Sequence, residues 1–204
     1  MNFNLFKSEE CSYYERIVKR KSRFLSQKNN DVDLFHVNKL SPNQLHAVFH
    51  ISDEYKFGTK NSGDVLSVPF NQYINTFFFS DSSMFLVEAI NDNYSNMVID
   101  NLVAKTKNNQ IRKMSLTNRQ MLDIVISLDA RIKLIEYERD DESFELENVD
   151  SYSEAFEDTN NIHYLLLNVK DKLMSIKMGN TISVNNSEED YLIRFTGELI
   201  NALK

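Results

Sequence analysis

Tight hairpin signals restrict the fold of this chain more than any other feature of its sequence. Short runs rich in β-branched and aromatic residues alternate with short polar turns. Strands joined by such turns must pair antiparallel, because parallel strands need a long crossover connection. The sequence therefore predicts antiparallel hairpins over Thr76–Ile90, Ile132–Glu147 and Tyr164–Met178, with further strands at Val65–Phe70 and Thr181–Val184.

Capping signals predict helices around these hairpins. The stretch Ser41-Pro42-Asn43-Gln44 offers an N-cap serine followed by proline at the first helical position. Thr117 and Gln120 have the spacing of a capping box, and an acidic first turn follows Ser187. Helices are therefore expected after Ser41, over Tyr94–Lys107, after Thr117 and after Ser187.

Together these patterns predict an α+β fold, with a mainly antiparallel sheet built from β-hairpins with packed helices, preceded by a helical N-terminal region. Two divisions stay open. Either a helical region over 1–56 precedes an α+β domain over 57–204, or one continuous domain spans 1–204. A hairpin followed by a helix occurs twice, at Thr76–Lys107 and at Tyr164–Leu203, and two such units could join their strands into one surface.

Composition excludes several classes of function. The four glycines, at positions 58, 63, 179 and 197, are too scattered for a phosphate-binding loop. Cys11 is the only cysteine, which excludes an internal disulfide and a thiolate zinc cluster. No apolar run is long enough to cross a bilayer, and charged residues soon after Met1 argue against a secretion signal. We therefore expect a cytoplasmic protein with no membrane segment and no cofactor.

The stretch Tyr14–Leu25 is the most positively charged part of a chain whose net charge is −7. On a helix, Arg16, Lys19, Arg20 and Arg23 would share one arc, opposite a largely apolar side. Such a face could follow a nucleic-acid backbone, bind an acidic protein partner, or be an ordinary solvated helix face. The sequence leaves these three interpretations open.

Negative charge gathers between Glu136 and Asp158. Alternation places Glu136 and Glu138 on one face of the first strand there, and Glu145 and Glu147 on one face of the second. Like charges that face each other across a ladder destabilise it. The segment could be a solvated loop, a docking surface for a basic element such as the protein's own N-terminal helix, or an oxygen-rich site for Ca²⁺ or Mg²⁺.

Few residues suggest catalysis. His46, His50 and Asp53 would lie on one face of the helix predicted after Ser41, where zinc would accept them as ligands. However, Ala47 occupies the place of the glutamate in the H-E-x-x-H signature. The stretch Asp53-Glu54-Tyr55-Lys56 contains the acidic-x-Lys order of metal-dependent nucleases, but it follows a predicted helix rather than lying on a strand.

The leading hypothesis is a non-enzymatic intracellular interaction protein or assembly subunit that self-associates, in the setting of a bacterial mobile element or phage defence. It rests on the lack of catalytic motifs and on opposed charge along the chain, which favours head-to-tail or partner contacts. The alternative is a nucleic-acid-binding protein that uses Arg16, Lys19, Arg20 and Arg23. A second alternative is a metal-dependent hydrolase or nuclease.

Overall fold

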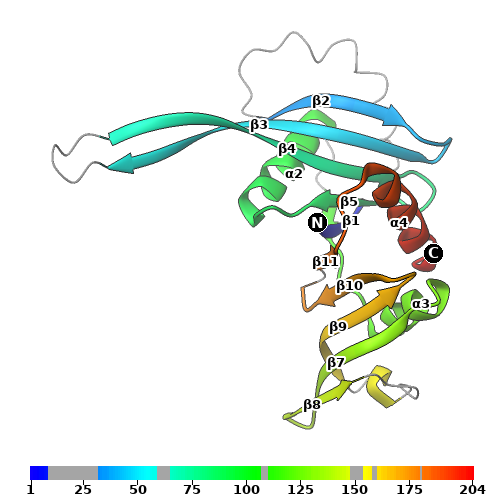
Figure 1. Cartoon of the computed structure of the whole chain (residues 1–204). Coiled ribbons are helices and arrows are strands. Elements are labelled where there is room, and N and C mark those ends of the chain that lie inside the picture. The colour runs from blue at the N-terminus through cyan, green and yellow to red at the C-terminus, as the bar shows by residue number, and fades with distance from the viewer. Residues whose placement is uncertain (9–31, 59–64, 107–109, 148–153, 158–159, 180) are drawn as a thin grey trace.

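The structure is a computed structural model that describes residues 1–8, 32–58, 65–106, 110–147, 154–157, 160–179 and 181–204 (Figure 1). Most of these residues lie in strands. The elements in chain order are β1 (Asn2–Ser8), β2 (Val32–Lys39), β3 (Gln44–Gly58), β4 (Val65–Phe79), β5 (Met84–Glu88), α2 (Asp92–Thr106), β6 (Ile111–Lys113), α3 (Asn118–Ser127), β7 (Arg131–Arg139), β8 (Glu142–Glu147), the short 3₁₀ helix η2 (Glu154–Phe156), β9 (Asn161–Val169), β10 (Lys172–Lys177), β11 (Thr181–Val184) and α4 (Glu189–Ala202).

The strands of the described residues form one 11-stranded antiparallel sheet. Its order is β2-β3-β4-β5-β1-β11-β10-β9-β7-β8, and β6 pairs with β1 outside this path. The first strand of the chain therefore lies in the middle of the sheet. β1 pairs with β5 along one edge and with β11 along the other. Its backbone therefore joins two halves of the sheet, one made of β2–β5 and the other of β7–β11.

Two apolar cores lie on opposite faces of this sheet. On the β2–β5 half, α2 covers the face that carries Phe49, Ile51 and Ile74. On the opposite face, α3 packs on β9 and α4 packs on β4, over a core that also contains Leu165 and Ile182 (Figure 1). β5 and β11 flank β1, run antiparallel to it, and are each followed by a helix on a different face. The two hairpin–helix units thus contribute strands to one sheet.

The prediction of a helical region over 1–56 is wrong for residues 1–8 and 32–56, which are the part of it that the structure describes. β1, β2 and β3 are strands, and the residues from Gln44, where a helix capped by Ser41 was expected, form β3. The Ser41 hydroxyl does accept the backbone N–H groups of Asn43 and Gln44, at 3.2 and 3.0 Å, as an N-cap would. This pattern closes a turn as readily as it caps a helix. From Leu45 to Ile51 every second side chain is buried against α2, and that period of two belongs to a strand.

The other elements predicted within the described residues are confirmed to within a few residues at their ends. The capping box at α3 is present, because the Thr117 side chain accepts the Gln120 N–H and the Gln120 side chain accepts the Thr117 N–H. The antiparallel sheet and the packing of α2, α3 and α4 on it are also as predicted. The runs Val65–Phe70 and Thr76–Phe79, expected as separate strands, are parts of β4. None of the helices in the described part of the chain is long and apolar enough to span a membrane.

The hairpins β7–β8 and β9–β10 close through two-residue turns in which both residues have positive φ. Asp140 and Asp141 have φ of 53° and 63°, and Lys170 and Asp171 have φ of 49° and 63°. These are the backbone angles of a type I′ turn, which matches the twist of the flanking strands and favours Asn-Gly. The left-handed conformation costs a residue with a Cβ about 1–2 kcal/mol.

Replacing Asp171 by glycine is expected to stabilise the protein by about 0.5–1 kcal/mol, because relief of left-handed strain exceeds the extra entropy of the unfolded chain. Urea unfolding of the wild type and of Asp171→Gly measures this. Lys172→Gly, one residue further in β10, is the control and should destabilise, since glycine weakens a strand. A loss of stability in Asp171→Gly would contradict the assignment of the turn.

Candidate interaction surface: a projecting hairpin arm

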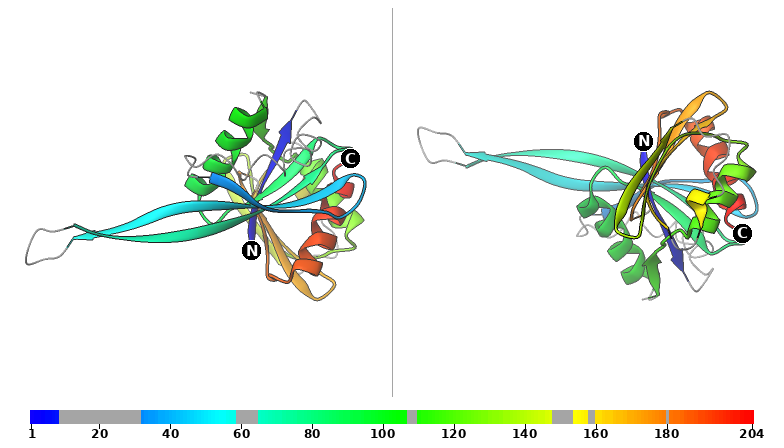
Figure 2. Two further views of the ribbon diagram at one scale, coloured as in Figure 1. Left: turned by 90° about the horizontal axis from the view of Figure 1, so that it is seen from above. Right: turned by 90° about the horizontal axis from the view of Figure 1, so that it is seen from below.

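β3 and β4 extend far beyond their neighbours in the sheet. In the described residues β2 begins at Val32, opposite Ile51 of β3, and β5 pairs with β4 only over Thr76–Phe79. Beyond these points Ser52–Gly58 and Val65–Asn71 pair with each other and with no other described residue. We call these two segments the arm. Figure 2 shows it projecting from the body in both views.

One face of the arm is apolar. The register places Tyr55 opposite Val68, with Leu66 and Phe70 on the same face of β4. The exposed fractions are 64% for Tyr55, 50% for Leu66 and 48% for Val68. This face continues the one that α2 covers on the body, where Ile51 and Ile74 are fully buried. An apolar surface that forms core in the body therefore runs on into solvent along the arm.

The opposite face of the arm is mainly polar. Glu54 lies opposite Pro69, and Lys56 lies opposite Ser67. The Ser67 hydroxyl donates to Glu54 Oε2 at 2.9 Å, and Lys56 Nζ lies 3.8 Å from the same oxygen. Val65 is the exception, an aliphatic side chain that is 67% exposed on this face. The arm is therefore an amphipathic ribbon.

At its root the arm is tied to α2 through Asp53. The hydroxyl of Tyr94, a buried residue of α2, donates to Asp53 Oδ2 at 2.7 Å, and the backbone N–H of Glu54 donates to Asp53 Oδ1 at 2.7 Å. The bond from Tyr94, followed by that from Glu54, lowers the pKa of Asp53 below its ordinary value of 3.8. The same bond raises the pKa of Tyr94 above 10.0. A shallow groove of about 650 Å³ beside this contact is lined by residues that include Phe70, Asn93 and Met97.

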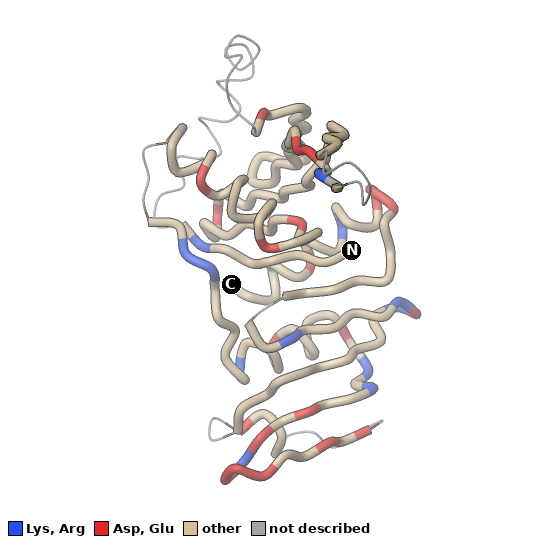
Figure 3. Tube along the Cα trace, turned by 90° about the vertical axis from the view of Figure 1, so that its left-hand side faces the viewer, with Lys and Arg blue, Asp and Glu red and all other residues tan. Residues whose placement is uncertain are grey.

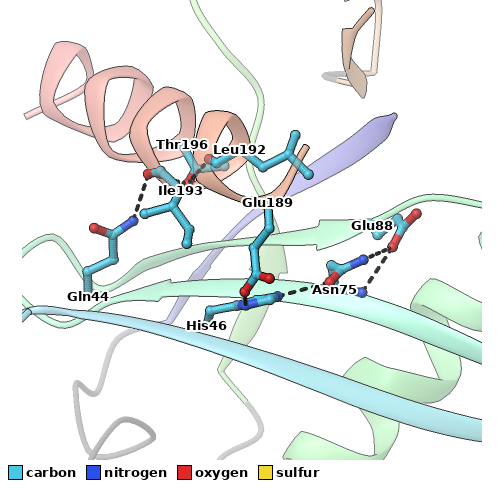
Figure 4. A network of polar contacts seen from close by, with 8 residues as sticks. All are labelled: Gln44, His46, Asn75, Glu88, Glu189, Leu192, Ile193 and Thr196. Carbon is cyan, nitrogen blue, oxygen red and sulfur yellow. Dashed lines mark hydrogen bonds and ion pairs between the residues drawn. The ribbon is translucent and has the colours of Figure 1, made fainter. Parts of the chain in front are cut away.

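A buried polar network lies on the other face of the same two strands (Figure 4). Asn75 donates to Glu88 Oε2 through its backbone N–H, at 3.0 Å, and through Nδ2, at 2.7 Å. Its Oδ1 lies 2.9 Å from His46 Nε2. Since Nδ2 of Asn75 is a donor to Glu88, Oδ1 must be the acceptor, so His46 Nε2 carries a proton. The His46 ring stacks on Phe77 with centroids 4.6 Å apart.

The network reaches α4 through Glu189. His46 Nδ1 lies 3.2 Å from Glu189 Oε1, a distance that suits an ion pair with a protonated ring, although the atoms are not aligned for a hydrogen bond. Gln44 Nε2 also donates to the Ile193 carbonyl at 3.0 Å. A cavity of about 280 Å³ opens beside His46, with His36 and Phe35 in its lining. These contacts fasten the first turns of α4 to β3.

The predicted grouping of His46, His50 and Asp53 depended on the helix that does not form. On a strand, side chains alternate between faces, so His46 and His50 lie on the face of α4 and Asp53 lies on the face of α2. His50 Nε2 meets Asn71 Oδ1 at 2.9 Å, while Asp53 binds Tyr94. The three residues do not converge. Within the described ranges no group of three or more His, Cys, Asp or Glu residues is placed to hold a metal ion.

The acidic hairpin β7–β8 forms with the alternation that the sequence indicates. Glu136 lies directly opposite Glu145, and Glu138 and Glu147 lie on the same face. Figure 3 shows the acidic residues gathered at this end of the sheet. His163 Nε2 lies 3.1 Å from Glu138 Oε2, within hydrogen-bonding distance. The role of this face as a docking surface stays a prediction.

The basic residues Arg16, Lys19, Arg20 and Arg23 lie outside the described residues, so their role also stays a prediction. The arm is the feature that sequence reasoning missed. A signal was present, because Leu66, Val68 and Phe70 alternate with Ser67, Pro69 and Asn71. The residues before Gly58 fall in the helix predicted after Ser41 and in the segment that follows it, so the alternation in β4 has no predicted partner strand there.

Comparison with known proteins does not indicate a family or a function for this chain. No protein-family model matches the chain, and no curated protein matches it in sequence. The function must therefore be inferred from the arm, the network and the charge distribution.

Tyr94→Phe is expected to loosen the root of the arm and to raise the pKa of Asp53 toward 3.8. Because the folded-state pKa of Asp53 is lowered, the stability that this bond contributes is present above pH 3.8 and is lost as the pH falls through the folded pKa. The raised pKa of Tyr94 sets an upper pH limit on the same stabilisation. The free energy that the Tyr94–Asp53 bond contributes is fully present below pH 10.0 and is lost as the pH rises through the folded-state pKa of Tyr94.

NMR titration of the Asp53 carboxyl group in the wild type and in Tyr94→Phe measures this shift. Hydrogen exchange of the arm amides should be faster in the variant at neutral pH. Tyr73→Phe, which removes the hydroxyl of a half-exposed tyrosine on the other face of β4, is the matched control. An unchanged Asp53 titration in Tyr94→Phe would show that the bond does not hold the arm.

Asn75→Ala is expected to destabilise the protein by about 2 kcal/mol, because it removes one donor to the buried Glu88 and the acceptor of the buried His46. Asn71→Ala is the matched control, since Asn71 makes the same type of contact with His50 at an exposed position. It should cost less than about 0.5 kcal/mol. Denaturant unfolding compares the two, and equal losses would contradict a structural role for the network.

Proposed function

We propose that this protein is a non-catalytic intracellular interaction protein that self-associates through the arm. The observation that carries this proposal is the apolar face of the arm, where Tyr55, Leu66 and Val68 are each about half exposed or more. A two-stranded hairpin is marginally stable in water by itself. A long ribbon with an exposed apolar face is the kind of surface that proteins use for contact with other proteins.

The energetics of this face suit a contact of moderate strength. Covering apolar surface stabilises an interface by roughly 25 cal/mol for each Å² removed from water. Burying the exposed parts of Tyr55, Leu66 and Val68 would then contribute about 1 kcal/mol each. Interfaces commonly depend on a few such central residues.

The charge of the arm favours a protein over a nucleic acid as its partner. Its described residues include Asp53, Glu54 and Lys56, so acidic side chains outnumber basic ones. A surface that follows phosphates needs several Arg or Lys residues. The arm therefore supports self-association better than it supports nucleic-acid binding.

Two of the candidate catalytic residues, His46 and Asp53, make contacts that support a structural role. His46 is buried, stacked on Phe77 and bonded to Asn75. Asp53 holds the arm to α2. These contacts support a protein whose polar side chains position an interaction element.

Val68→Asp is expected to abolish self-association, because it places a charge in the centre of the apolar face. Val65→Asp is the matched control, since it makes the same change at a more exposed valine on the opposite face of the same strand. Sedimentation velocity over a wide range of protein concentration measures both variants against the wild type. If the wild type remains monomeric at every concentration, the proposed function is wrong.

A further inference from the structure

We infer that two copies of this chain join by stacking the apolar faces of their arms in opposite directions, so that the outer end of each arm, at Leu66, lies beside α2 of the other copy. A two-fold axis between the arms relates the two copies. This inference rests on the proposed function, because it specifies how the arm self-associates. The occupant of the apolar face is therefore the arm of a second copy.

The apolar face of the arm is exposed beyond the reach of α2. Leu66 and Val68 are 50% and 48% exposed, on the side of β4 that carries the fully buried Ile74. Between them and the body lie Phe70 on β4 and Met97 on α2, which are partly buried and pack against the same core as Ile74. The exposed face is thus continuous with a core, and a partner laid on it would extend that core.

α2 defines the layer that the partner would occupy. It packs on the apolar face at the root of the arm, where its Tyr94 donates to Asp53, and the arm continues past it (Figure 1). A helix with its side chains is about 10–12 Å thick, and stacked sheets lie about 10 Å apart. A second ribbon laid on the apolar face would therefore lie at the height of α2, next to it along the arm.

The same helix decides the direction in which two arms can stack. If the arms pointed the same way, the root of the partner's arm and the sheet around it would fall where α2 stands. The two apolar faces could then not approach to the distance of about 10 Å at which sheets pack. If the arms point in opposite directions, each α2 lies beyond the outer end of the partner's arm. Antiparallel stacking is therefore the arrangement that lets the apolar faces meet.

Antiparallel stacking also decides which residues meet. Val68 is the midpoint of the β4 segment of the arm, and Leu66 and Phe70 follow it by two residues on either side, on the same face. A two-fold axis at Val68 therefore places Leu66 of each copy near Phe70 of the other. Asn93 and Met97 of α2 line the groove of about 650 Å³ beside Phe70. This groove is thus the place that receives the outer end of the partner's arm.

The carboxylate on the apolar face is compatible with burial. Asp53 is the only Asp or Glu among the described residues of this face. The Tyr94 hydroxyl and the Glu54 N–H donate to its two oxygens, at 2.7 Å each. Asp53 therefore keeps two hydrogen bonds when a partner excludes water from it. Glu54 and Lys56 have their side chains on the opposite face, where they would remain in contact with water in the dimer.

The size of the contact suits a reversible dimer. Each strand of the arm is about 23 Å long, at about 3.3 Å per residue. Two stacked ribbons of this length, each with its outer end against the partner's α2, would bury on the order of 1,000 Å² in total. Interfaces smaller than about 1,200 Å² belong mostly to weak or transient complexes. The population of the dimer is therefore expected to rise with protein concentration.

The test pairs a new negative charge at Leu66 with a new positive charge on α2 of the other chain. Leu66→Glu in the full chain places a carboxylate on the apolar face and should weaken pairing with a wild-type chain by about fivefold. Asn93→Lys changes an exposed residue of α2 and leaves the core intact. Because Leu66 of one copy lies beside Asn93 of the other, the Leu66→Glu chain should bind the Asn93→Lys chain about threefold more strongly than it binds wild type.

Sedimentation velocity of a dilute, fluorescently labelled Leu66→Glu chain, titrated with each unlabelled chain in turn, measures these heterodimers. Ser67→Lys is the matched control, because it adds the same charge on the opposite face of the arm. It should bind the Leu66→Glu chain no more strongly than wild type does. The gain from Asn93→Lys should also shrink as salt is added, since it depends on a pair of charges.

The outcomes separate this inference from the proposed function. If Leu66→Glu weakens the pairing but Asn93→Lys restores no more of it than Ser67→Lys does, the arms meet in another arrangement and the antiparallel stacking is wrong. If Leu66→Glu has no effect while Val68→Asp abolishes self-association, the stacking is likewise overturned. A wild type that is monomeric at every concentration overturns both, and would mean that a second copy is not the occupant of the apolar face.

Discussion

The backbone hydrogen bonds on both edges of β1 join the two halves of the sheet. β1 also contributes side chains to both cores, with Phe3 and Leu5 on the face of α3 and α4 and Phe6 on the face of α2. Neither half has a complete core without this strand. The position of β3 and β4 in the α2 half depends on the same pairing, because β5 connects them to β1.

The strand β3, which continues into the arm, is held to the body by different contacts on its two faces. On one face Asp53 binds Tyr94 of α2, and on the other His46 and Gln44 contact the first turns of α4. β3 is thus fixed between two helices that belong to different cores. A surface held in place before assembly loses less conformational entropy on binding than a loose one. This is the physical reason why polar residues in the body matter for an apolar surface outside it.

Sequence patterns predicted the helices and hairpins whose conformation depends on residues close together in the chain. The Thr117–Gln120 capping box and the hairpins over Ile132–Glu147 and Tyr164–Met178 all involve residues close in sequence. Ser41 shows the limit of such reasoning. Its hydroxyl accepts the N–H groups expected of an N-cap, yet the chain continues as a strand, because burial against α2 and pairing with β4 decide the conformation of the residues that follow.

The sequence by itself determined the hairpins, the helices after β5 and β11, the crowding of carboxylates at Glu136 and Glu145, and the alternation that makes β4 amphipathic. Only the tertiary structure decided that β1 lies at the centre of the sheet, that the helices cover opposite faces, and that His46 and Asp53 point apart. It also decided how far the described parts of β2 and β5 reach beside the arm, where Leu66 and Val68 are about half exposed. The reason is that backbone pairing between residues far apart in the chain has no local signature, whereas capping, turn geometry and alternation are set by neighbours within a few residues.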